Sequence, residues 1–287
     1  MVTMVLQTAR PFSTHPRAVS VCRVGARQKD AAVPRELSHS LAVLFSLLFV
    51  ATAVLALNPD WFDRPVVKRI SRFTTDWQFT NVLAFVLSYP TLESAIVVSC
   101  VWSCWFSGIE AELRAQIVSG AFAGACAVVI SHFVQRILPT SPKPVFDPAL
   151  QLHLPAILGD IESLRATAFS GAHTFPSARA TMFASLAIAI LPVRLDIRLL
   201  ALGCTVAAEI SRIYLRLHYP TNIIGSFSLA ASLVLLAQMQ WGHALGSWFV
   251  SWERSSAAIF YMCAFFLSYQ LTNGFRDVRE IAAQLLR

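Results

Sequence analysis

The chain has 287 residues, of which 56% are hydrophobic and only 14% are charged. Soluble domains carry about 25% charged residues, so this composition excludes an ordinary soluble protein and predicts a multi-pass integral membrane protein. Basic residues gather ahead of the first apolar run, so the net charge of +7 is expected to set membrane topology rather than to bind nucleic acid. Most cysteines lie within apolar runs, where Cys behaves as a small hydrophobe, so neither a disulfide framework, a metal site nor a cofactor is predicted.

The first 110 residues divide into a tail and the first membrane spans. Residues 1–36 are basic and lack helical periodicity, so a mobile cytoplasmic tail is expected. Within residues 37–110, the uncharged run 38–59 predicts one spanning helix of about 20 residues. Residues 60–77 then place apolar and basic side chains on opposite sides of a helix, which predicts an interfacial helix. The apolar run 79–106 is broken by Tyr89-Pro90 and predicts one kinked span.

Residues 111–241 are predicted to form the core of the bundle. The run 116–135 is apolar and places Gly120 and Gly124 at the small-residue spacing that lets two helices approach closely. A polar, Pro-rich connection of roughly 35 residues follows at 138–174, longer than most bundle loops unless it serves as a lid or binding loop. Three further spans are expected at 175–192, 197–215 and 222–239.

The C-terminal part, residues 242–287, is predicted to add a seventh span at 255–272 and a short amphipathic tail. With the basic tail in the cytoplasm and the kinked run counted as one span, Arg136, residues 176–179 and residues 212–222 fall on the non-cytoplasmic face. Counting the kinked run as two spans would reverse this topology.

The stretch from Ser211 to Asn222 lies where one long apolar run ends and the next begins. It places Arg212 and His218 at the membrane surface. Because an ionisable residue costs roughly 2.5 to 3.5 kcal/mol at the centre of a spanning helix, residues kept at this depth point to function. An arginine can fork two hydrogen bonds onto a phosphate, and a histidine can attack phosphorus or carry a proton. The stretch therefore indicates phosphoryl chemistry; the alternative is a capped helix end with interfacial anchors.

Three segments resemble the signatures of the type-2 phosphatidic acid phosphatase superfamily. The resemblance extends over the core, from about residue 120 to about residue 240. In the third signature, Ser-Arg is followed by five residues, His, three residues and Asp, and here Asn222 stands in the place of that Asp. The segment Phe175-Pro176-Ser177-Ala178-Arg179 resembles the second signature, Pro-Ser-Gly-His, with Arg179 in the place of His. Arg136, six residues and Lys143-Pro144 resemble the first signature, Lys, six residues and Arg-Pro, with the two cations exchanged.

The resemblance implies an all-α membrane bundle with a six-helix phosphatase-like core, and the seventh span would be extra to it. It also implies a metal-independent phosphate site at the membrane surface that works through a phosphohistidine. His218 would be the nucleophile and Asn222 would orient it. The phosphoryl oxygens would be held by Arg136, Lys143, Ser177 and Arg212. Ser177 would also cap the helix that it opens.

Two positions depart from the family pattern. The family histidine in the second signature protonates the leaving oxygen, and Arg179 cannot do so because a guanidinium keeps its proton. Asn222 can accept a hydrogen bond from His218 but cannot stabilise a charged imidazolium as a carboxylate would. Three explanations stay open: the leaving group is a phosphate that needs no acid, His173 replaces the acid, or the protein is no longer a phosphatase. Glu209 is expected to pair with a neighbouring arginine.

The leading hypothesis is therefore a membrane enzyme that acts on a lipid phosphate or diphosphate, either a polyprenyl diphosphate or a phospholipid-like donor, by metal-independent phosphoryl transfer through His218. The first alternative is a transferase that moves a phosphoryl or glycosyl group from a polyprenyl-linked donor to an acceptor. The second alternative is a lipid-phosphate binder or transporter that uses the cations without catalysis.

Overall fold

The computed structural model describes residues 35–73, 78–150, 174–193 and 195–273, together with residues 281 and 284. Within these residues it contains ten α-helices, one 3-10 turn and no strand, which confirms the all-α prediction. The elements are α1 (Arg35–Leu57), α2 (Asp63–Phe73), α3 (Gln78–Leu87), α4 (Pro90–Phe106), α5 (Ala111–Ile137), η3 (Pro144–Phe146), α7 (Ala178–Ala189), α8 (Leu195–Tyr214), α9 (Pro220–Ala237), α10 (Gln240–Ser255) and α11 (Ala257–Thr272). The predicted N-terminal tail, most of the loop 138–174 and the amphipathic C-terminal tail lie outside the described residues.

Fewer helices than predicted are long and apolar enough to cross a membrane. Among the described residues these are α1, α5 and α9, and a fourth span results if the bent pair of α3 and α4 is counted as one. The seven predicted spans are therefore not confirmed. The helices α7 and α11 have only 12 and 16 residues, and α8 carries charged side chains such as Glu209 and Arg212 along its length. The break at Tyr89-Pro90 is confirmed, since α3 and α4 meet there at an angle of 53°.

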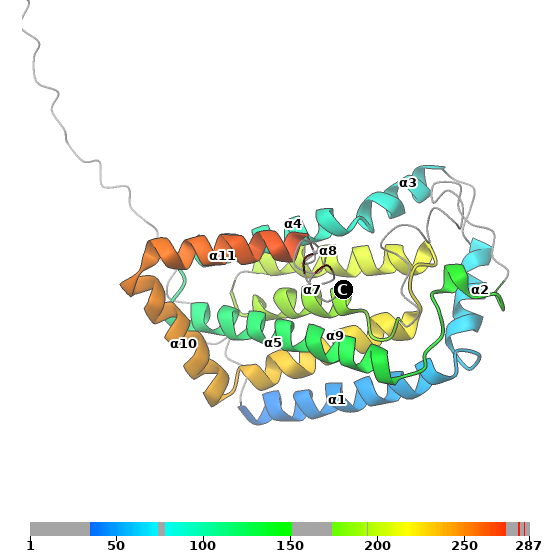
Figure 1. The fold of residues 1–287 in the computed structure, drawn as a ribbon, viewed down its shortest axis with the longest axis horizontal. Coiled ribbons are helices and arrows are strands. Elements are labelled where there is room, and N and C mark those ends of the chain that lie inside the picture. The colour runs from blue at the N-terminus through cyan, green and yellow to red at the C-terminus, as the bar shows by residue number, and fades with distance from the viewer. Residues whose placement is uncertain are drawn as a thin grey trace, which may run out of the picture. The chain divides into compact units, whose positions relative to one another are not determined.

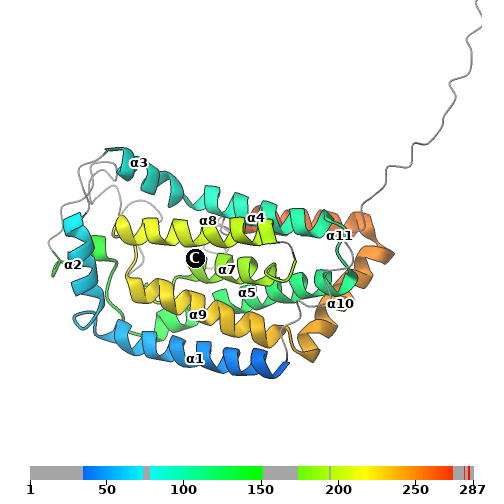
Figure 2. The same ribbon diagram turned by 180° about the vertical axis from the view of Figure 1, so that it is seen from behind.

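The short helix α7 lies in the middle of the bundle, where Figures 1 and 2 show α5, α8 and α9 running beside it. Small side chains let its neighbours come close. A Cβ atom added to Gly120 would lie 2.3 Å from the Cβ of Ala189, and one added to Gly124 would lie 3.0 Å from the Cβ of Ser185. The glycine spacing on α5 is thus confirmed as the contact with α7. Hydroxyl groups on α7 are satisfied within the helix, as in the 2.8 Å bond from Ser185 Oγ to the Thr181 carbonyl.

The sequence patterns predicted no helix over residues 240–253, where the structure has α10. It packs across α5, and a Cβ atom on Gly246 would lie 2.1 Å from the Ala115 carbonyl oxygen. Arg114 on α5 fixes the same crossing through a 3.0 Å ion pair with Glu253. Close backbone contact and this ion pair therefore fix α10 against α5.

The helix α2 is amphipathic as predicted, and it ties the start of α9 to the segment that follows α5. Asp63 accepts hydrogen bonds from the backbone N–H of Thr221, at 3.1 Å, and from its hydroxyl, at 2.5 Å. Arg64 pairs with Asp147 at 2.9 Å. These contacts anchor the two segments on which the candidate site depends. A position of α2 at the membrane surface stays a prediction.

Candidate active site

The three segments singled out in the sequence meet at one end of the bundle. The side chain of Gln135, near the end of α5, donates a 2.6 Å hydrogen bond to the carbonyl of Pro176, just before α7. The backbone N–H of Val145 donates to the carbonyl of Arg216, after α8, at 3.0 Å. The N–H of Ser177 donates to Ser226 Oγ on α9 at 2.8 Å. Residues far apart in the sequence are thus held together by hydrogen bonds that each involve at least one backbone group.

His218 lies in the turn between α8 and α9. The residue as a whole is partly exposed, but its Nδ1 atom is buried and has no hydrogen-bond partner among the residues that the structure describes. Burial lowers the pKa of His218 well below its usual range, and the nearby cations of Lys143, Arg212 and Arg179 lower the pKa further. The imidazole is therefore neutral at neutral pH, which is the form that can act as a nucleophile.

Lys143 and Arg179 bring two of these cations to His218 from different elements. Lys143 precedes η3 and is only 8% exposed, and Arg179 lies in the first turn of α7. Burial, together with the charges of Arg179 and Arg212, lowers the pKa of Lys143 to about 8. Gathering like charges costs free energy, so a site built this way favours an anion.

Arg212 is the third cation, and it is paired with two carboxylates. Its guanidinium donates to Glu93 Oε2 at 2.6 Å and contacts Glu209 Oε1. All three side chains are at most 3% exposed. The pairing of Glu209 with an arginine is confirmed. The expected role of Arg212 as a phosphate ligand stays a prediction, since a phosphate would have to share this guanidinium with the two carboxylates.

The carboxylates of Glu93 and Glu209 each keep one oxygen that is buried without a hydrogen-bond partner in the described part of the chain, Glu93 Oε1 and Glu209 Oε2. Arg179 acts electrostatically on both carboxylates. The site next to His218 therefore contains three cationic side chains and two carboxylic acids. Buried groups of this kind are rarely left unsatisfied unless a ligand, a proton or water completes them.

Ser177 and Asn222 both make hydrogen bonds at or just before the start of α7. Ser177 is the N-cap of α7, and its Oγ accepts from the N–H of Ala180 at 3.4 Å. The Asn222 side-chain amide donates to Thr174 Oγ1 at 2.7 Å. Because His218 Nδ1 has no partner in the described residues, the expected hydrogen bond between Asn222 and this ring nitrogen is not formed. Asn222 instead fixes the segment that leads into α7.

Arg136 is not brought into the site. Arg136 is exposed near the end of α5, and its charge is not among those that lower the pKa of His218. His173 lies outside the described residues. Arg216, at positive φ (63°), donates from Nε to Ser71 Oγ on α2 at 3.1 Å, so it anchors the turn. Within the described residues, no group of three His, Cys, Asp or Glu side chains could hold a metal ion.

No family model, no curated protein and no solved structure matches this chain.

Sequence reasoning missed the residues that support the site. Asp147 accepts hydrogen bonds from Tyr219 at 2.6 Å and from Arg64 at 2.9 Å. Burial opposes ionisation of Asp147, but these hydrogen bonds outweigh it and lower its pKa. The sequence did offer a sign for Glu93, because it is a single acid within an apolar run. Burying such an acid costs free energy unless it is paired. For Asp147, in a polar loop, the sequence offered no comparable signal.

Raising the pH through about 8 is expected to weaken anion binding at this site about tenfold, because Lys143 is charged below that pH and neutral above it. Titration calorimetry with sulfate, a tetrahedral dianion whose own charge stays constant over this range, measures the effect. Lys143→Arg should keep tight binding at the higher pH. Lys68→Met removes an exposed lysine of α2 and should leave the profile unchanged. The same pH dependence in Lys143→Met would rule out Lys143 as its source.

Proposed function

We propose that the chain is a multi-pass membrane enzyme that transfers the phosphoryl group of a lipid phosphate or diphosphate through His218, without a metal ion. The observation that carries this proposal is the buried Nδ1 of a neutral His218, which has no hydrogen-bond partner among the described residues, beside Lys143, Arg179 and Arg212. A neutral imidazole supplies the nucleophile, and fixed cations stabilise the charge that develops on the phosphoryl oxygens. The resemblance to the type-2 phosphatidic acid phosphatase superfamily, with a six-helix core, supports the same function.

The substrate is a lipid because the site lies at one end of a bundle of apolar helices. Among the described residues, α5 and α9 are long and apolar enough to cross a membrane, and both contribute an end to the site. A phosphate head group at that end would leave its hydrocarbon tail at the depth of the helices. On the topology predicted from the basic N-terminal tail, the site opens on the non-cytoplasmic face.

The reaction proceeds in two steps. A ring nitrogen of His218 attacks the terminal phosphorus of a polyprenyl diphosphate, the P–N bond forms, and the bond from phosphorus to the bridging oxygen breaks. The leaving group is the polyprenyl monophosphate, already an anion, so it needs positive charge more than it needs a proton. Arg179 supplies that charge. Water then cleaves the P–N bond and releases inorganic phosphate, which frees His218.

The proposal is tested with purified protein in detergent and a chelator. The expected result is stoichiometric release of inorganic phosphate and polyprenyl monophosphate from the diphosphate. The transferase alternative, which the replacement of the family's His and Asp favours, predicts a different result. The labelled donor would be consumed without release of inorganic phosphate, and the label would appear on an added acceptor. Saturable binding of the diphosphate with no turnover, unchanged in His218→Gln, would support the non-catalytic binder or transporter.

Arg179→His is expected to shift substrate preference from diphosphates toward monophosphates. A histidine can protonate an alkoxide leaving group, whereas the arginine only stabilises one that is already charged. The ratio of kcat/KM for a polyprenyl diphosphate to that for the matching monophosphate should fall by about tenfold or more, because a positioned acid contributes about 10²- to 10⁴-fold. Arg179→Ala is the matched control and should lower both values. An unchanged ratio in Arg179→His would show that Arg179 does not contact the leaving group.

A further inference from the structure

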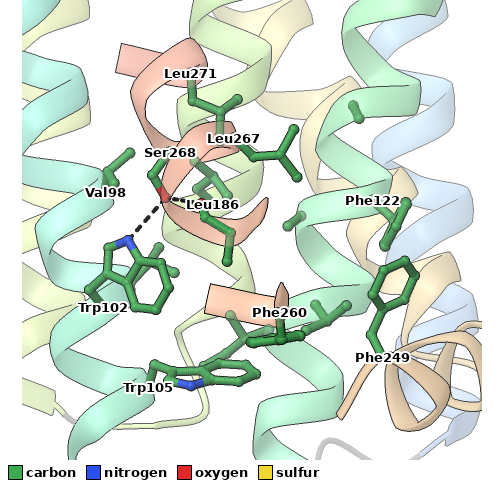
Figure 3. Close-up of a pocket in the computed structure, with 16 residues that line it drawn as sticks. Val98, Trp102, Trp105, Phe122, Leu186, Phe249, Phe260, Leu267, Ser268 and Leu271 are labelled. Carbon is green, nitrogen blue, oxygen red and sulfur yellow. Dashed lines mark hydrogen bonds between the residues drawn. The ribbon is translucent and has the colours of Figure 1, made fainter. Parts of the chain in front are cut away.

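A cavity of about 330 Å³ lies between α4, α5, α10 and α11, and α7 forms part of its wall. Figure 3 shows aromatic and aliphatic side chains from these helices pointing into it. The largest of them are Trp102, Trp105, Phe122, Phe249 and Phe260. Small-molecule sites have volumes of about 300 to 1,000 Å³, so this cavity fits one slender molecule.

The polar groups of the described lining already bond within the protein. The indole N–H of Trp102 donates to Ser268 Oγ at 3.0 Å, as Figure 3 shows, and this hydroxyl donates to the Ala264 carbonyl at 2.8 Å. The indole N–H of Trp105 donates to the hydroxyl of Tyr261 at 3.2 Å. A polar ligand or a water molecule would find no partner among these groups. The lining chemistry therefore fits hydrocarbon.

The cavity lies in line with the candidate active site. Arg179 and Leu186 are seven residues apart on α7, which places them on one face of the helix and about 10 Å apart along its axis. Between them, Met182 and Phe183 pack with Leu186 and with Val97 of α4 in one apolar cluster. The residues of this cluster that lie between Arg179 and the cavity are thus all apolar.

We propose that this cavity holds the hydrocarbon tail of the same lipid whose phosphate groups bind at Lys143, Arg179 and Arg212. The inference rests on the proposed function for the head group and assigns the tail to a site of its own. One hydrocarbon tail fills the cavity. The phosphate head group of the same lipid then lies two helical turns away, beside His218. The cavity then selects substrates with a long tail.

Ala121 lines the cavity from α5, and Ala121→Trp would fill it. We expect this change to lower kcat/KM for a long polyprenyl diphosphate at least tenfold and to leave kcat/KM for a single-isoprenoid diphosphate unchanged. Ala51→Trp, at an exposed position of α1, is the matched control and should change neither value. Equal values for the long substrate in Ala121→Trp and in the wild type would overturn the proposal.

A second measurement uses the wild-type protein and does not depend on turnover or on the folding of a variant. A long polyprenyl diphosphate with a photoreactive diazirine in its tail should label peptides of α4, α5 and α11, and excess unmodified diphosphate should prevent this labelling. Labelling in this cavity without turnover would support the tail site while the proposed function fails. Labelling of other helices would overturn the inference. Equal labelling by the same tail without a diphosphate would also overturn it, and would show that the cavity is a groove for bulk membrane lipid.

Discussion

His218→Gln is expected to lower kcat for phosphate release by about 10³-fold or more, since removal of a nucleophile costs enzymes up to about 10⁶-fold in kcat. Glutamine cannot form the P–N bond, so the covalent step is lost. The fold should tolerate the change, because the buried Nδ1 has no hydrogen-bond partner in the described structure and the residue is partly exposed. Binding of the diphosphate should persist, because Lys143 and Arg179 remain.

The matched control is His39→Gln, which alters an exposed histidine on α1 and should keep full activity. Initial rates of phosphate release, measured at saturating substrate with apparent Tm recorded for each variant, separate loss of chemistry from loss of fold. A His218→Gln protein that is folded and turns over at the wild-type rate would contradict the assigned nucleophile.

Arg212→Met is expected to destabilise the protein by about 3 to 5 kcal/mol, because it leaves two buried carboxylates without their shared cation. Glu93 and Glu209 are 0% and 1% exposed, so solvent does not screen them. For a chain of this size, the loss corresponds to a fall in apparent Tm of roughly 10 °C in thermal unfolding. Arg254→Met, which removes a basic residue in the last turn of α10, is the control and should change the apparent Tm little.

Adding Glu93→Gln and Glu209→Gln to Arg212→Met should restore most of the lost stability. Neutral amides remove the uncompensated charges while keeping the volume of the side chains. This triple variant should bind phosphate weakly, which separates the structural role of the cluster from its role in the site. A triple variant that is less stable than Arg212→Met alone would show that the carboxylates do not need the arginine.

Local patterns in the sequence predicted much of this arrangement. The bend at Tyr89-Pro90 follows from the missing backbone donor of proline, and the close contact of α5 with α7 follows from the absent side chains of Gly120 and Gly124. The segments singled out in the sequence lie at helix ends, where the chain must turn, and the fold brings Lys143, Arg179, Arg212 and His218 together there.

Contacts between distant segments could not be predicted in this way. Glu93 is 119 positions from Arg212 in the sequence, so only the packing of α4 against α8 reveals that they pair. Asn222 was expected to contact His218, but a hydrogen bond to Thr174, 48 positions away, holds its side chain instead. The predicted span count is not confirmed, and one reason lies in α7, which has only 12 residues and is surrounded by other helices.

The most direct test of the central claim is to trap the phosphoryl group on the protein. Wild-type protein is mixed with a polyprenyl diphosphate labelled at its terminal phosphate, quenched in alkali to preserve phosphohistidine, and digested for mass spectrometry. The account predicts label on the peptide that holds His218, and none in His218→Gln. Label on another residue, or turnover with the same label in His218→Gln, would contradict it.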